Sequence, residues 1–352
     1  METQILVLNT GSSSTKIALF KNGEQMWKEE VMHPAADLAT LTTIEEEYQY
    51  RLKVLEEWMD APMEAVSAIG CIGGILKPMA GGVYQVNQKL CDDIVEGRTE
   101  AKHASNLSAL IGYALAQKYN IPAFIVDPIS TDEMTAVAKI SGLPSVPRKS
   151  RTHALNVKAC MRRAVRENLV KPEDTVIVAH IGGGLTINLV RNGLIEDIED
   201  GRQCGPFSTE AAGAISCPDF IEHYWDKGGS KKDLMKFWYG KGGFMAHSGN
   251  NSIKDEIEKA KAGDEKSSLL LDAMVYQIAK SIGALYTVAK GKISGIIFTG
   301  GASRSQFLID KLNDKVGWMA KIIVYPGEEE LAAISESVGL VLEGTLVQKE
   351  YN

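Results

Sequence analysis

The chain has 352 residues and a formal net charge of −7, with 45% apolar and 24% charged residues. This length allows two domains with a core each, while the negative charge excludes a broadly basic surface for nucleic acid or anionic lipid. Because glycine or charge interrupts every apolar run before membrane length, we expect a cytoplasmic protein that binds neither membrane nor nucleic acid.

The first half of the chain alternates strand and helix patterns. A hairpin of two strands is predicted first, with Asn22-Gly23 at its far end. Thr43 and Glu46 form a capping box at the start of the first helix. Asp127 follows the last strand of this half. The further elements expected here are a helix over 42–59, a strand over 66–72, a helix over 103–119 and a strand over 123–126.

The second half repeats the opening hairpin at residues 176–193, after a helix expected over 154–168. Residues 220–263 are rich in glycine and are expected to be of mixed structure. The alternation of strands and helices predicts an α/β fold with largely parallel sheets. The remaining predicted elements are a helix over 267–290, strands over 294–299 and 322–325, and a C-terminal helix from about residue 328.

The two hairpins share one plan. Each is an apolar strand that ends in a polar residue, Asn9 or His180, followed by a turn of small residues, a second strand and a basic-Asn-Gly end. The first turn reads Gly-Ser-Ser-Ser-Thr-Lys, and a third glycine turn follows the strand at 294–299. The first turn is not a Walker loop, because its glycine and lysine spacing differs from that motif and no helix follows directly. A serine-rich turn with an exposed Lys16 is the alternative for the first copy alone. Three such turns at strand ends favour a bound nucleotide, and duplication suggests two similar domains.

These motifs resemble those of the acetate kinase family. Residues 9–16, 180–184 and 298–301 are similar to its first phosphate, second phosphate and adenosine motifs. The segments 77–82, 153–156 and 205–208 are most similar to butyrate kinases, and the resemblance extends over nearly the whole chain. It implies duplicated actin-like (ribonuclease H-like) ATPase domains flanking a nucleotide cleft, and a homodimer. The implied reaction is ATP-dependent phosphorylation of a short-chain carboxylate to an acyl phosphate, with Mg²⁺, by direct in-line transfer.

The resemblance also implies roles for residues. His180 would contact the transferring phosphoryl group, and His153 would be a second active-site histidine. Asp127 would lie near the reacting carboxylate and the metal. Asn9 and Glu329 would associate with the metal, with the register among the adjacent glutamates 328–330 left open. A hydrogen-bonded histidine that orients a hairpin, a helix-capping Asp127 and a solvated run of glutamates are the alternatives. The implied nucleotide-binding residues are Asn9, Gly11, Ser12, Ser13, Ser14, Thr15, Lys16, Gly182, Gly183, Gly184, Gly300, Gly301 and Ala302.

Two family arginines are missing from this chain. Ile72 stands where butyrate kinases usually read Gly-Arg-Gly-Gly, and Ala211 stands in place of the arginine of Pro-Glu-Arg-Ser-Gly. Arg202, in an expanded segment before Pro206, is the candidate substitute, with a solvated loop arginine as the alternative. The second hypothesis for function is therefore a nucleotide-binding homologue that has lost carboxylate chemistry and acts in regulation or interaction.

Domain limits and cysteines complete the prediction. An N-terminal domain over 1–150 and a C-terminal domain over 151–330 are expected, with a terminal helix over 331–352 that returns to the first domain. The five cysteines include no C-x-x-C pair, so they are expected to be reduced thiols packed as small apolar residues.

Overall fold

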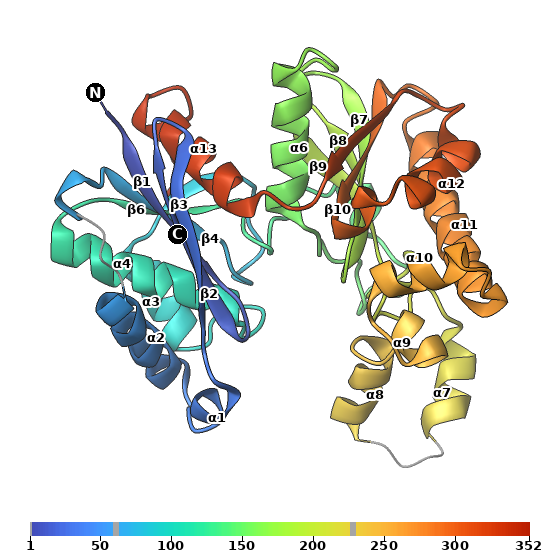
Figure 1. Cartoon of the computed structure of the whole chain (residues 1–352), viewed down its shortest axis with the longest axis horizontal. Helices are drawn as coiled ribbons and strands as arrows, with labels where there is room; N and C mark the ends of the chain where they lie inside the picture. Colours follow the sequence, from blue (N-terminus) through green and yellow to red (C-terminus); the bar gives the residue numbers. More distant parts are fainter. Residues whose placement is uncertain (1, 59–62, 226–229) are drawn as a thin grey trace. The chain divides into compact units, whose positions relative to one another are not determined.

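The computed structural model describes residues 2–58, 63–225 and 230–352. The chain forms two units, each with its own sheet and core (Figure 1). Unit 1 comprises Met1–Asp132 and Glu329–Asn352, and unit 2 comprises Glu133–Glu328. The domain limits at 150 and 330 stay predictions.

Unit 1 is built on a six-stranded sheet in the order β3-β2-β1-β4-β6-β5. Strands β1, β2 and β3 are antiparallel, whereas β1, β4 and β6 are parallel. Asn22 and Gly23 both have positive φ, which suits the two-residue turn between β2 and β3. The strands are β1 (Gln4–Thr10), β2 (Ser14–Lys21), β3 (Glu24–Met32), β4 (Ala68–Ile72), β5 (Val83–Gln85) and β6 (Ala123–Val126).

Helices cover both faces of this sheet. Alternate residues of a strand point to opposite faces, and β4 shows the consequence. A Cβ on Gly112 of α4 would lie 2.3 Å from Cys71 Sγ, and a Cβ on Gly70 would lie 2.5 Å from Ile334 of α13. Glycine at these positions lets α4 and α13 approach from the two sides. The helices of unit 1 are α1 (Ala35–Leu38), α2 (Ile44–Trp58), α3 (Gln88–Val95), α4 (Leu107–Tyr119) and α13 (Glu330–Leu342), with 3-10 turns at Met63–Ala65 and Ala104–Asn106.

Unit 2 repeats the strand order of unit 1. Its sheet is ordered β11-β10-β7-β8-β9, again a hairpin with a third antiparallel strand on one side. On the other side β10 pairs in parallel with β7, and β11 pairs in parallel with β10. This confirms the predicted duplicated hairpin. The expectation of largely parallel sheets is wrong, because each repeat contributes three antiparallel strands. The strands are β7 (Thr175–Ile181), β8 (Leu185–Arg191), β9 (Leu194–Asp200), β10 (Gly295–Gly300) and β11 (Ile322–Pro326).

Helices also cover unit 2. Ile177 and Ala179 of β7 belong to the core with α11 and α12, whereas Val176 and Val178 belong to the core with α6. The segment expected to be mixed is largely helical in its described residues, with helices capped by Ser230 and other side chains. The helices are α5 (Ala136–Lys139), α6 (Ala154–Arg166), α7 (Cys217–Trp225), α8 (Lys231–Trp238), α9 (Gly243–Ser248), α10 (Ile253–Lys261), α11 (Glu265–Val288) and α12 (Gln306–Val316), with a 3-10 turn at Gly301–Arg304.

The cysteines divide into two groups. Cys71, Cys91 and Cys160 are buried, as expected for small apolar residues, and none of the five forms a disulfide. Cys204 and Cys217, however, are exposed, because both lie in the turns and helices that follow β9. Among the described residues no helix is long and apolar enough to span a membrane.

Candidate functional site

In unit 1 the polar end of β1 lies beside the serine-rich turn. Asn9 is buried and is the cross-strand partner of Lys16 on β2, so the two side chains share one face of the sheet. Gly11 N–H donates to Ser14 O at 2.8 Å and closes the turn. Ser12 and Ser13 are exposed at its tip, whereas Ser14 and Thr15 are buried.

The three consecutive glutamates have different surroundings. Asn9 Nδ2 donates to Glu330 Oε2 at 2.6 Å. Glu328 Oε1 lies 3.0 Å from His180 Nε2 in unit 2. Glu329 is exposed and precedes α13 without capping it through its side chain. The role of Glu329 at a metal stays a prediction, and Glu330 is the glutamate that the fold brings to Asn9.

Asp127 lies at the carboxyl end of β6 in a left-handed backbone conformation, with φ of 37°. It is buried, its Oδ1 accepts from Gly82 N–H at 2.7 Å, and its own N–H donates to Gly82 O at 2.9 Å. The next helix begins only at Ala136, so Asp127 does not cap a helix. A non-glycine residue with positive φ at a strand end is a strained position of the kind that concentrates at functional sites.

In unit 2, His153 and His180 are stacked. Their ring centroids are 3.7 Å apart and the rings are 9° from parallel. His180 Nδ1 lies 2.9 Å from Asn156 Oδ1, and His153 Nδ1 lies 3.1 Å from Thr186 Oγ1. Both nitrogens of His180 therefore face oxygen atoms, because Nε2 faces Glu328. This explains the spacing of the His-Ala-Leu-Asn segment, which places His153 and Asn156 around one imidazole.

Burial sets the electrostatics of this stack. It lowers the pKa of His153 well below its ordinary value, and the charges of His180 and Arg202 lower it further. His153 is therefore a neutral imidazole at pH 7. The glycine turn 182–184 packs closely against this stack, since a Cβ on Gly184 would lie 2.8 Å from His153 Cε1. A Cβ on Gly182 would lie 3.3 Å from His180 Nε2, whereas a Cβ on Gly183 would meet nothing within 4 Å.

The third glycine turn follows β10 in unit 2. Gly300 has φ of 87°, and a Cβ there would lie 2.4 Å from Ile181 O at the end of β7. Only glycine lets the two strand ends approach this closely. Gly301 and Ala302 open the short 3-10 turn that follows.

The two positions that lack the family arginine are buried and apolar. Ile72 ends β4, and Ala211 lies among tightly packed backbone, with Gly242 and Gly243 against it. Arg202 is exposed in the turn after β9, where its guanidinium lies 5.8 Å from the ring centre of Tyr239. The charge of Arg202 contributes to lowering the pKa of the half-buried His153, after desolvation and His180.

The structure thus forms two groups of site residues, one in each unit. Asn9, Lys16 and the serine turn gather at one strand end of unit 1, and the histidine pair gathers over the glycine turn of unit 2. The sequence did not assign roles to Asn156, Thr186, Glu328 or Glu330. The His-Ala-Leu-Asn motif was the signal for Asn156, and the run of glutamates was the signal for the last two.

Comparison with known proteins supports a common origin. Residues 148–318 match the model of the acetokinase family. The chain is 39% identical to the probable butyrate kinase 2 of Caldanaerobacter subterraneus over 99% of both chains, and 38% identical to the probable butyrate kinase of Listeria monocytogenes over the full length of both.

Solved structures agree on the fold. The acetate kinase of Porphyromonas gingivalis is 19% identical, with a TM-score of 0.75 over 96% of this chain and 100% of the other. A propionate kinase of Francisella tularensis is 18% identical, with a TM-score of 0.73 over 95% of this chain and 98% of the other. These likenesses confirm the predicted α/β fold of duplicated actin-like units. The chain therefore belongs to the acetokinase family and resembles the butyrate kinases within it.

Proposed function

We propose that the protein phosphorylates a short-chain carboxylate with ATP and releases an acyl phosphate and ADP. The observation that carries this proposal is the pair of equivalent hairpin turns, 11–16 and 182–184, in a chain that aligns end to end with probable butyrate kinases. A cytoplasmic homodimer is part of the same proposal.

The turns supply the nucleotide site. Exposed Ser12 and Ser13 offer N–H and hydroxyl donors, and Lys16 adds a positive charge on the same hairpin. In unit 2, residues 182–184 take phosphate oxygens and residues 300–302 take the adenosine. Small residues serve here because phosphate must approach the backbone closely.

The residues of unit 1 suit Mg²⁺ chemically. Mg²⁺ prefers oxygen ligands, keeps several waters and is usually held by one or two carboxylates together with substrate phosphates. The hydrogen-bonded pair of Asn9 and Glu330 presents amide and carboxylate oxygens of this kind. No group of three or more acidic, histidine or cysteine side chains suited to a metal occurs among the described residues. When bound, the ion would neutralise phosphate charge.

The transfer itself needs little covalent chemistry from the protein. A carboxylate oxygen attacks the γ-phosphorus in line, an O–P bond forms, and the bond to the β–γ bridging oxygen breaks so that ADP leaves. His180 would donate a hydrogen bond from Nε2 to the transferring group in place of its contact with Glu328 Oε1, and the stacked neutral His153 holds its ring in place. Asp127 lies near the acyl oxygens, and Arg202 supplies the positive charge that Ile72 and Ala211 do not.

Trapping the product tests the proposal. The purified chain is incubated with MgATP, hydroxylamine and acetate, propionate, butyrate or isobutyrate, and hydroxamate is measured. We expect hydroxamate with at least one acid and dependence on both ATP and Mg²⁺. If MgADP binds in calorimetry while all four acids give no product, the carboxylate kinase proposal is wrong and the nucleotide-binding homologue replaces it.

A further inference from the structure

A buried arginine lies under the serine turn of unit 1. Arg51 of α2 is fully buried and is the largest such side chain among the described residues. Its Nη1 donates to Gly11 O at 2.8 Å and to Ser14 O at 3.3 Å, and its Nη2 donates to Ser12 O at 3.0 Å. One guanidinium therefore holds three carbonyl groups of the turn. Only arginine has enough donors in one plane to do this.

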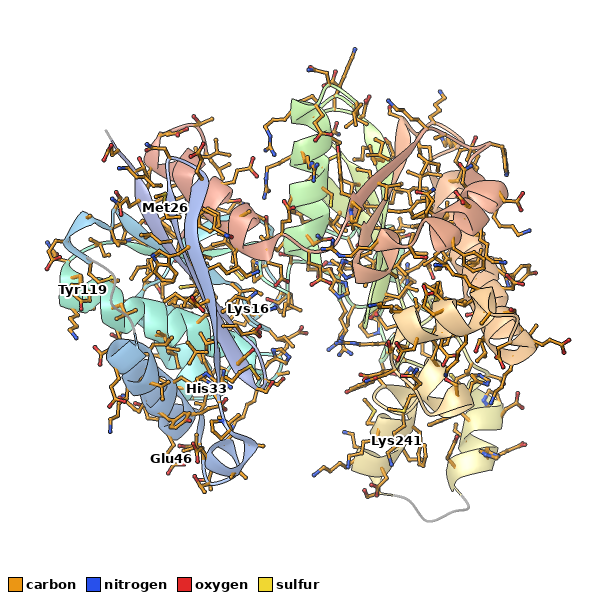
Figure 2. The ribbon with its side chains drawn as sticks, viewed as in Figure 1. Lys16, Met26, His33, Glu46, Tyr119 and Lys241 are labelled. Atoms are coloured by element: carbon orange, nitrogen blue, oxygen red, sulfur yellow. The ribbon has the colours of Figure 1, made fainter. Side chains whose placement is uncertain are left out.

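The fourth carbonyl is held as well. His33 N–H donates to Ser13 O at 2.8 Å, and His33 Nε2 lies 2.9 Å from Thr15 Oγ1. His33 and Lys16 both belong to unit 1 (Figure 2). Burial and the charge of Arg51 lower the pKa of His33 to about 4, so it adds no second positive charge at pH 7. The carbonyl oxygens of four consecutive residues, 11–14, thus all accept hydrogen bonds from the protein.

The N–H groups at the tip of the turn are in the opposite situation. Ser12 and Ser13 are exposed, and within the described part of the chain neither their N–H nor their hydroxyl groups have an acceptor. When peptide carbonyl groups point into the protein, the N–H groups of the same peptides point outward and can bind an anion. A buried guanidinium is costly unless its donors are satisfied, and the ionic partner of Arg51 within the described residues, Glu47, is 31% exposed. Arg51 therefore adds positive potential beneath the turn.

We propose that Arg51 is a positioning residue for phosphate binding: from below, it fixes the carbonyl groups of residues 11–14 so that the N–H groups of Ser12 and Ser13 face the nucleotide phosphates. This inference rests on the proposed nucleotide site. Arg51 itself touches no substrate, since its side chain has no exposed surface.

A conservative variant and a matched control test this role. Arg51→Lys keeps the charge but cannot reach three carbonyls, whereas Leu55→Ala removes a fully buried side chain one turn further along α2. We expect Arg51→Lys to weaken MgADP binding and raise the KM for ATP by about tenfold, a change of about 1.4 kcal/mol. The KM for the carboxylate should stay within about twofold. Leu55→Ala should lower the melting temperature yet bind MgADP as the wild type does.

Hydrogen exchange of the wild type supplies a measurement that does not depend on variants. Exchange at residues 12 and 13 should be fast without nucleotide and slow with MgADP, while exchange in α2 around Arg51 stays unchanged. Given a wild type that forms acyl phosphate, the inference is overturned if Arg51→Lys binds MgADP as tightly as that wild type. It is also overturned if Leu55→Ala weakens MgADP binding as much as Arg51→Lys does, or if MgADP leaves hydrogen exchange in the turn unaltered. An enzyme that binds MgADP but makes no acyl phosphate would instead overturn only the proposed reaction.

Discussion

One position of the duplicated hairpin carries different chemistry in the two units. Asn9 and His180 are each the second-last residue of their strand, and their cross-strand partners are Lys16 and Thr186. The amide is paired with a carboxylate, and the imidazole is stacked on a second imidazole. The repeated backbone therefore presents an amide side chain in unit 1 and an imidazole side chain in unit 2 at the same position of the hairpin.

Asp127→Asn separates charge from structure. Asparagine tolerates positive φ and its Oδ1 can still accept from Gly82 N–H, so the melting temperature should change little. If Asp127 acts beside the carboxylate, turnover should fall at least about a hundredfold with MgADP affinity nearly unchanged. Initial rates and calorimetry on the same preparation decide, and full activity in Asp127→Asn would refute the role.

Gly184→Ala tests the tightness of the histidine stack. The new Cβ would lie 2.8–2.9 Å from His153, so the ring must move. We expect a loss of about 1–3 kcal/mol in the free energy of unfolding, measured in urea. Gly183→Ala is the matched control, because its Cβ meets nothing within 4 Å, and should change stability by less than about 1 kcal/mol. Equal effects of the two variants would argue against close packing at His153.

Arg202→Ala tests whether the missing arginines have a substitute. An arginine on the transferring phosphoryl group contributes about 10³-fold or more to the rate. We expect turnover at saturating MgATP to fall by about that factor, and the pKa of His153 to rise because a neighbouring positive charge is lost. Arg191→Ala, at a partly exposed arginine paired with Glu196, should leave turnover unchanged.

Ordinary turnover in Arg202→Ala would show that Arg202 is a solvated loop residue. Restoring a guanidinium at Ala211 is a poor complement to this experiment, since Ala211 is buried against backbone and the larger side chain would disturb the packing.

At the scale of elements, the C-terminal segment braces the region around Asp127. Lys349 N–H donates to Val83 O at 2.8 Å beside the Gly81-Gly82 turn, and Tyr351 is buried with its hydroxyl 3.0 Å from Asp93 Oδ2. Lys77 and Arg98 hold the pKa of Asp93 well below its ordinary value. The segment therefore connects the ion pairs of the buried Asp93 to the turn that pairs with Asp127.

Deleting residues 349–352 should expose this cluster. We expect the free energy of unfolding to fall by about 3 kcal/mol or more, because a large buried side chain and its hydrogen bond are lost, and turnover to fall with it. Deleting the exposed Asn352 alone should change neither. Thermal melting and initial rates compare the two truncations, and equal behaviour would show that the segment braces nothing.

At the scale of the molecule, the stability of the fold should depend on pH through buried histidines. The pKa of His33 is about 4 in the folded chain against 6.5 otherwise, so the unfolded chain takes up a proton first as the pH falls. The contribution of His33 to the free energy of unfolding should be fully present above pH 6.5 and should be lost as the pH falls towards 4. Between pH 7 and pH 4.5, His33→Gln should lose on the order of 2 kcal/mol less of its free energy of unfolding than the wild type. Urea midpoints at pH 7 and 4.5 measure it, with the exposed His247→Gln as the control that should follow the wild type.

Much of this architecture is predictable because local signals repeat. Asn-Gly ends and small-residue turns identify both hairpins, whereas the strand order and the mixed pairing of each sheet could not be predicted from the alternation of strands and helices. Arg51 could not be predicted, because periodicity places Leu52 in the apolar stripe and a charged residue is normally assigned to the surface. The hydrogen bond between Asn9 and Glu330 could not be predicted either, since the register of the three glutamates at a helix start depends on tertiary contacts.

The two exposed thiols have a practical consequence for spectroscopy. Cys204 and Cys217 both belong to unit 2, while the thiols of unit 1 are buried. Partial desolvation of the thiol raises the pKa of Cys204 although the residue is exposed, and this slows its reaction because the thiolate is the reactive form. A maleimide dye therefore marks unit 2 alone in the unaltered chain, and a Cys204→Ser variant would carry one reporter at the start of α7.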